Sequence, residues 1–133
     1  MLSRLYAFQD RVWWFDWGLC FALLLAVVAS LPFLSRPSLP RQTDAELHIY
    51  RAAELGHVLR DGAFYPRWAP DFYYGYGYPI FNYYAPLTYY LANGVSLLPG
   101  VDIVAGVKAI FICGLLVAGI GTYLLGRAIF GPT

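Results

Sequence analysis

Residues 43–91 read TDAELHIYRAAELGHVLRDGAFYPRWAPDFYYGYGYPIFNYYAPLTYYL, and this stretch decides how the chain is organised. Its first part has the spacing of an amphipathic helix, which we place at residues 43–61. The part that follows is rich in aromatic residues and broken by glycine and proline, which predicts an ordered loop. The chain on either side is strongly apolar. We therefore expect this stretch to lie at the surface of a membrane that the rest of the chain crosses.

The composition places the chain among membrane proteins. Of its 133 residues, 59% are hydrophobic and 13% are charged, whereas about a quarter of the residues of a soluble domain are charged. The formal net charge is +1, and the basic residues are scattered along the chain. Nucleic acid is therefore not an expected partner. Cys20 and Cys113 both lie in apolar segments, so we expect neither a disulfide nor redox chemistry.

Three segments are apolar enough for transmembrane helices, each of which needs about 20 residues. We place them at 17–35, 81–98 and 101–126, after an N-terminal interfacial segment at 1–16. The segment 81–98 is short and contains several polar residues, so a re-entrant or interfacial helix stays open as the alternative. Residues 36–80 form the loop between the first two spans. The tail at 127–133 suggests that the chain is the N-terminal piece of a longer protein.

The amphipathic helix has start and stop signals. Thr43 and Glu46 have the spacing of a capping box, and Asp61 and Gly62 supply the stop. At 100° per residue, an apolar arc carries Leu47, Ala52, Leu55, Val58 and Leu59. The opposite, polar arc carries Glu46, Glu54, His57, Arg60 and Asp61. We predict that the apolar arc is buried.

Three ionisable residues, Asp44, His48 and Arg51, project onto that apolar arc. An unpaired charge on a buried face costs roughly several kcal/mol, so the trio needs partners. In a structural interpretation, which the trio by itself favours, Arg51 pairs with Asp44 and His48 donates to a backbone carbonyl. In a catalytic interpretation, the helix directs Asp44 and His48 into a cavity at the water interface. Asp44 is then a general base or a ligand of a divalent cation.

The aromatic loop supplies further candidates. Its aromatic side chains either line the headgroup region of the membrane or form a stacking surface for a sugar ring or an isoprenoid. Arg67 and Asp71 are its charged residues and are spaced to pair with each other. Arg67 is also the best candidate in the loop for binding a phosphate, through bidentate hydrogen bonds.

The order of these features resembles a known family. The motifs TDAELH at the helix start, PRWAPD in the loop and GYGYPIFNYYAPLTYYL after it are similar to bacterial membrane proteins described as 6-pyruvoyl-tetrahydropterin synthase-related. More distantly, the chain resembles the GT-C superfamily of polyprenyl-phosphate-dependent glycosyltransferases, which includes the protein O-mannosyltransferase and aminoarabinose transferase types. The resemblance covers nearly the whole chain. The pterin-synthase description finds no support, because His48 and His57 lie on different faces of one helix and do not form a zinc-binding cluster.

The GT-C resemblance implies an all-α membrane protein of the bacterial inner membrane, with its first loop on the extracytoplasmic side. Charge by itself leaves the orientation open, because arginines flank the first span on both sides. The resemblance assigns catalysis to Asp44, with Asp-Ala-Glu here in place of two adjacent acids, and a polyprenyl-phosphate sugar as donor. We expect His48 to orient Asp44, and Asp44 also to bind a divalent cation, Mg²⁺ or Mn²⁺, the only cofactor expected. The expected substrate-binding residues are Arg51, Arg67, Asp71, Tyr78, Asn82 and Tyr84.

Two other function classes stay open. One is a non-catalytic membrane protein, such as a scaffold or a subunit of envelope polysaccharide assembly, in which the trio is structural. The other is a transporter, against which stands the lack of charged residues deep in the predicted spans apart from Lys108. The expected partners are membrane lipid, a polyprenyl-phosphate-linked sugar and the remaining transmembrane helices of a longer chain. We expect the isolated piece to be inactive, because GT-C donor sites draw on later spans.

Overall fold

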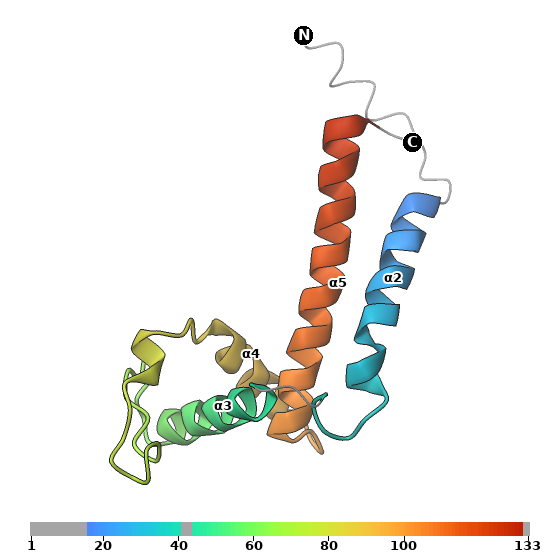
Figure 1. Cartoon of the computed structure of the whole chain (residues 1–133). Helices are drawn as coiled ribbons and strands as arrows, with labels where there is room; N and C mark the ends of the chain where they lie inside the picture. Colours follow the sequence, from blue (N-terminus) through green and yellow to red (C-terminus); the bar gives the residue numbers. More distant parts are fainter. Residues whose placement is uncertain (1–15, 41–43, 132–133) are drawn as a thin grey trace.

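The computed structural model describes residues 16–40 and 44–131, and this part of the chain is mostly helical (Figure 1). Its elements are α2 (Trp17–Leu34), α3 (Ala45–Arg60), the 3-10 helix η1 (Ile80–Asn82), α4 (Leu87–Ser96) and α5 (Ile103–Phe130). Within these residues the only strand-like pairing is an isolated antiparallel bridge between Ala69 and Tyr78. The expected all-α class is confirmed. Apart from Asp16, the predicted interfacial segment 1–16 lies outside the described residues.

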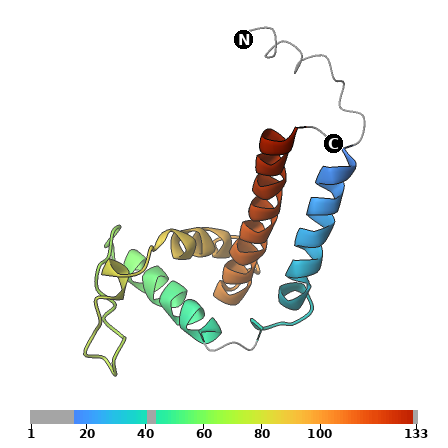
Figure 2. The same ribbon diagram turned by 45° about the horizontal axis from the view of Figure 1, so that its top comes forward.

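Two helices, α2 and α5, are long and apolar enough to cross a bilayer. They have 18 and 28 residues, which at a rise of 1.5 Å per residue gives about 27 and 42 Å, against about 30 Å for the hydrocarbon core. The two helices run antiparallel and side by side, as both views show (Figures 1 and 2). Most of their surface is exposed in the isolated chain. This exposure is expected of helices that face lipid, so the hairpin indicates membrane insertion.

The third span predicted at 81–98 does not form as one continuous helix. This segment contains the end of η1, a turn, and the 10-residue helix α4, which is about 15 Å long and half the thickness of the hydrocarbon core. The interruption has a local cause, because Pro79 and Pro86 are the N-cap residues of η1 and α4 and neither continues a preceding helix. Figures 1 and 2 show α4 beside α3, running from the aromatic loop to the foot of α5. A short helix thus forms in place of a continuous span, and the re-entrant or interfacial placement of this helix stays a prediction.

The helix α3 lies within the predicted range 43–61, and its burial agrees in part with the predicted arcs. Ala52, Leu55 and Val58 are buried, as expected. Two assignments are wrong: Leu47 is exposed, and Glu54, which was placed on the polar arc, is buried. Thr43 of the predicted capping box lies outside the described residues. The helix begins at Ala45, with Asp44 as its N-cap.

A small core joins α3, α4 and α5 at the foot of the hairpin. Its buried members are Leu39, Ala52, Leu55, Ala69, Ile80, Phe81, Tyr89, Ala92 and Val107. Glycine permits two close approaches here: Gly56 of α3 lies against the Asn93 side chain, and Gly106 of α5 lies against the Ala92 backbone. The Asn93 amide donates to the carbonyl oxygens of Ala52 and Tyr89, each at 2.8 Å. This core fixes α3 and α4 relative to the long helix α5.

The other end of the hairpin is closed by Asp16. One carboxylate oxygen caps α2 by accepting from the Leu19 N–H at 3.1 Å. The other oxygen accepts from the Tyr123 hydroxyl and from Arg127 Nη1, the latter at 2.6 Å. These contacts join the first residue before α2 to the last turns of α5. They fix the register of the two helices.

The aromatic loop between α3 and α4 is ordered, as predicted. Two backbone hydrogen bonds of 2.8 and 2.9 Å between Ala69 and Tyr78 join the two sides of this loop. Tyr73 and Tyr74 at its tip have positive φ angles of 58° and 59°, which L-residues other than asparagine and aspartate seldom adopt. The Tyr78 ring stacks on Tyr73 at 5.8 Å and lies 6.5 Å from the ring of Tyr83. Most of the loop's aromatic side chains are exposed.

Candidate functional site

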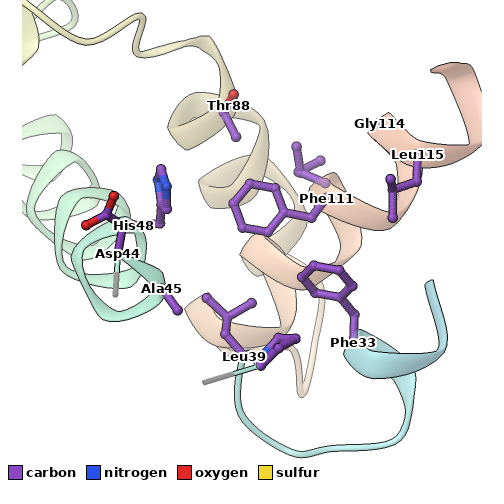
Figure 3. Close-up of a pocket in the computed structure, with 11 residues that line it drawn as sticks. Phe33, Leu39, Asp44, Ala45, His48, Thr88, Phe111, Gly114 and Leu115 are labelled. Atoms are coloured by element: carbon purple, nitrogen blue, oxygen red, sulfur yellow. The ribbon is translucent and has the colours of Figure 1, made fainter. Parts of the chain in front are cut away.

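A pocket of about 500 Å³ lies where the four helices come together (Figure 3). Its wall is mostly apolar and is formed by Phe33, Leu39, Pro40, Ala45, Ile110, Phe111, Gly114 and Leu115. Its polar lining residues are Asp44, His48 and Thr88. The pocket therefore combines a carboxylate and an imidazole with apolar groups from both long helices.

Asp44 and His48 come together because they are four residues apart at the start of α3. Figure 3 shows the Phe111 ring of α5 across from His48, with the Asp44 carboxylate on the other side of His48. The Asp44 carbonyl accepts from the His48 N–H at 3.3 Å. The Asp44 side chain is exposed and makes no cap hydrogen bond, although this residue is the N-cap. Its carboxylate is therefore not used in holding the helix.

The imidazole of His48 is held by two aromatic residues. Its Nδ1 lies 3.1 Å from the Tyr89 hydroxyl oxygen, and its ring meets the Phe111 ring edge to face at 5.5 Å. The predicted bond from His48 to a backbone carbonyl is thus replaced by one to Tyr89. Burial lowers the pKa of His48 below its usual value of 6.5, the Arg51 charge adds to this, and the Asp44 charge opposes it. His48 is therefore mainly neutral at pH 7.

Arg51 contacts the aromatic ring of Tyr84 rather than an acidic side chain. Its side chain is 8% exposed, and its guanidinium carbon lies 3.9 Å from the centre of the Tyr84 ring, which is a cation–π contact. The ion pair predicted between Arg51 and Asp44 is not among those formed by the described residues. Burial by itself lowers the pKa of Arg51, but contacts with the hydroxyl groups of Tyr89 and Tyr84 outweigh it and raise that pKa.

The structure divides the predicted substrate-binding residues into two groups, and neither lines the pocket. Arg51 and Tyr84 contact each other beside Tyr89. The other four, Arg67, Asp71, Tyr78 and Asn82, belong to the aromatic loop and η1. Figure 1 shows this loop at the end of α3 that is remote from α5. Because α3 has 16 residues, about 24 Å of helix separates the loop from the pocket.

The charged loop residues do not form the pair that their spacing suggested. Asp71 lies 3.9 Å from His57 Nε2 through its carboxylate and donates its backbone N–H to Glu54 at 2.9 Å. Arg67 is exposed. The loop therefore presents aromatic and charged side chains away from Asp44 and His48.

Asp44 is the predicted metal ligand, and it is the one acidic residue that lines the pocket among the described residues. Among the described residues, no group of three or more His, Cys, Asp or Glu side chains is arranged to hold a metal ion. A hard cation such as Mg²⁺ takes oxygen ligands and often keeps several waters. A cation at Asp44 would therefore draw its other ligands from water or from substrate oxygens.

Tyr89 is the site residue that sequence analysis missed. Its side chain is 3% exposed and its hydroxyl joins His48 of α3 to the short helix α4. The only signal for it is its place three residues after Pro86, in the middle of the segment 81–98 that is predicted to span the membrane. A tyrosine is expected near the ends of a span, as an interfacial anchor, so the pattern gives this one no role in a site. Its contact with His48, 41 residues earlier, has no counterpart in the local pattern.

Comparisons with models of known protein families, with curated proteins and with solved structures found no match. The pocket and its two ionisable side chains are therefore the basis for assigning a function.

A buried acid outside the pocket, Glu54, joins the aromatic loop to α3. Its side chain is 6% exposed and accepts from the Asp71 N–H. Burial raises the pKa of Glu54 above its usual value of 4.5, and the Asp71 hydrogen bond opposes this. The folded chain thus holds this proton more tightly than the unfolded chain. The stability that protonated Glu54 contributes to the folded chain is fully present below pH 4.5. It is lost as the pH rises through the raised pKa of Glu54.

Replacing Glu54 with glutamine should remove this pH dependence. Glutamine keeps an oxygen that accepts from the Asp71 N–H, but it does not titrate. Just above pH 4.5 the stability of the wild type should fall by up to about 1.4 kcal/mol per pH unit more steeply than that of the variant. Thermal unfolding of the chain in detergent, followed by circular dichroism at several pH values, measures this slope. Glu46→Gln, on the exposed side of the same helix, should keep the wild-type slope; equal slopes for all three proteins would contradict the prediction.

Proposed function

We propose that this chain is the N-terminal part of a GT-C-like membrane glycosyltransferase. It moves a sugar from a polyprenyl-phosphate donor to an acceptor on the extracytoplasmic side of the bacterial inner membrane. The supporting observation is the pocket, in which Asp44 and His48 lie beside apolar groups of two candidate membrane-spanning helices. Such a pocket suits a reaction in which one substrate carries a lipid and the other a hydroxyl group.

In the proposed reaction, Asp44 acts as the general base. Its carboxylate accepts the proton of the acceptor hydroxyl while the hydroxyl oxygen forms a bond to the anomeric carbon of the sugar. The bond between that carbon and the phosphate oxygen breaks, and the polyprenyl phosphate leaves with the electron pair. The position of Asp44 supports this role, because this residue lines the pocket and its exposed carboxylate is free of a cap hydrogen bond.

The remaining predicted residues take supporting roles in this proposal. His48 is neutral and close to Asp44, so it orients the acceptor rather than carrying charge. Arg67 and the exposed tyrosines of the loop lie away from the pocket. We assign them to contacts with lipid headgroups or with distant parts of the donor. If the reaction uses Mg²⁺ or Mn²⁺, Asp44 would be the residue that holds the cation, and the cation would supply positive charge for the leaving phosphate.

Filling the pocket tests the proposal without removing an ionisable group. Gly114 lines the pocket, and a Cβ atom at this position would meet open space. Gly114→Leu should therefore fold normally while its side chain occupies the pocket. We expect transfer from radiolabelled polyprenyl-phosphate sugars to endogenous acceptor, in membranes containing the full-length protein, to fall about tenfold or more, because small misplacements of substrate cost this much.

Gly121→Leu is the matched control. Gly121 lies two turns further along the same face of α5, also has open space around it, and does not line the pocket. This variant should transfer sugar at the wild-type rate. Transfer by wild-type membranes that does not exceed that of membranes lacking the protein would contradict the function and favour a non-catalytic subunit of envelope polysaccharide assembly.

A further inference from the structure

The side chains of Arg51, Tyr89 and His48 form a chain of polar contacts that ends at the pocket. The Tyr89 hydroxyl is in contact with the buried Arg51 guanidinium on one side. On the other side its oxygen lies 3.1 Å from His48 Nδ1. Tyr89 is itself buried in the core that joins α3, α4 and α5. Tyr89 and His48 are therefore held by packing as well as by a hydrogen bond.

The direction of the hydrogen bonds follows from what each group can do. A guanidinium has only donors and is positively charged, so the neighbouring Arg51 favours a Tyr89 hydroxyl whose oxygen faces the guanidinium and whose proton points away from it. The tyrosine hydroxyl has one proton, which is then available for the unprotonated Nδ1 of His48. A neutral imidazole that accepts at Nδ1 carries its own proton on Nε2. In the described part of the chain, Nε2 makes no hydrogen bond to the protein.

We propose that Tyr89 is a positioning residue that fixes His48 as the Nε2–H tautomer, so that the imidazole offers a hydrogen-bond donor to the pocket. Asp44, one turn earlier on α3, also lines the pocket, and its carboxylate is an acceptor. A group that both donates and accepts fits this pair: it donates to Asp44 and accepts from His48 Nε2–H. A hydroxyl group has these properties, whereas a carboxylate or an ammonium ion has only one of them. The hydroxyl ligand rests on the proposed function, but the tautomer does not.

The surroundings of His48 determine how it titrates. On α3 it has Asp44 and Arg51 as charged neighbours, and these act on its pKa in opposite directions. From α4 it meets the Tyr89 hydroxyl, and from α5 the Phe111 ring. Lys108 is the charged residue of α5 at this end, and its ammonium group donates to the Arg36 carbonyl. A hydroxyl that donates to Nδ1 stabilises the neutral imidazole, so its removal should raise the pKa of His48.

Nitrogen NMR of the chain labelled with ¹⁵N-histidine, in lipid nanodiscs and without substrate, tests the tautomer directly. The chain has two histidines, and the exposed His57 serves as an internal reference. In the wild type, His48 should be protonated on Nε2 and titrate below its usual value. In Tyr89→Phe, which keeps the buried ring, both tautomers should be present. The pKa of His48 should rise by about half a unit to one unit, the worth of one hydrogen bond.

Tyr90→Phe is the control, because the neighbouring hydroxyl of Tyr90 donates to the Phe64 carbonyl and not to His48. It should leave the tautomer and titration of His48 unchanged. A wild-type His48 protonated on Nδ1 would overturn the proposal, even if Tyr89→Phe failed to fold. The same tautomer ratio and titration in Tyr89→Phe and wild type would also overturn it. Both outcomes are measured without sugar transfer. The tautomer can therefore be confirmed even if the proposed function is wrong, and the reverse also holds.

Discussion

Asp44→Asn is expected to lower sugar transfer by the full-length protein by about 100-fold or more, because asparagine cannot accept the proton of the acceptor hydroxyl. The fold should not change. Asp44 is the N-cap of α3 but makes no side-chain cap hydrogen bond, and asparagine is as good an N-cap residue as aspartate. The two side chains also have nearly the same size and shape. The substitution therefore separates the chemistry of the carboxylate from its structural role.

The measurement is the initial rate of transfer from radiolabelled polyprenyl-phosphate sugars in membranes, normalised to the amount of folded protein. Glu46→Gln is the matched control, because Glu46 lies in the same turn of α3, is exposed and does not line the pocket. It should transfer within about twofold of the wild type, as exposed substitutions usually do. A wild-type rate for Asp44→Asn would show that Asp44 is not the base. A lower amount of folded protein with a normal specific rate would make Asp44 structural.

The parts of the fold that follow local periodicity could be predicted from the sequence. The long apolar helices are evident from composition, because about 20 apolar residues in a row have few alternatives. The amphipathic helix was placed to within two residues at each end, and the burial of Ala52 and Leu55 followed from their spacing. In each case the information lies within one helix. No distant contact is needed to specify it.

The segment 81–98 shows where composition misleads. Its apolar and aromatic content resembles that of a span, but the prolines at 79 and 86 begin two separate short helices. Glu54 shows a second limit. Its helical projection was polar, yet the backbone N–H of Asp71, 17 residues later, allows its carboxylate to be buried. A partner supplied by a loop has no periodic signature.

The candidate site was predicted only where one helix defines it. Asp44 and His48 share a face of α3, so projecting the sequence onto a helix placed them together. Tyr89 was missed, because its contact with His48 depends on how α4 packs on α3. The loop residues, including Arg67 and Asp71, were assigned to the same site from their order in the chain. The length of α3 instead separates them from the pocket.

Gly106→Ala is expected to destabilise the folded chain by about 2 kcal/mol or more. Alanine is the better helix former by about 1 kcal/mol, so helix propensity by itself predicts the opposite sign. The packing decides, because a Cβ atom at this position would overlap the carbonyl oxygen of Ala92, a backbone atom of α4 that cannot rotate away. Unfolding of the chain in detergent, followed by circular dichroism, measures the free energy of unfolding of variant and wild type.

The control is Gly121→Ala, which adds the same methyl group to the same helix where nothing lies within contact distance. It should be neutral or stabilising, so the two variants are expected to differ in sign. Stability gained in both would contradict the close packing of α4 on α5. The packing also matters for the pocket, because α4 carries Thr88 and Tyr89. If Gly106→Ala pushes α4 away from α5, His48 loses its Tyr89 partner, and its pKa should rise as it does in Tyr89→Phe.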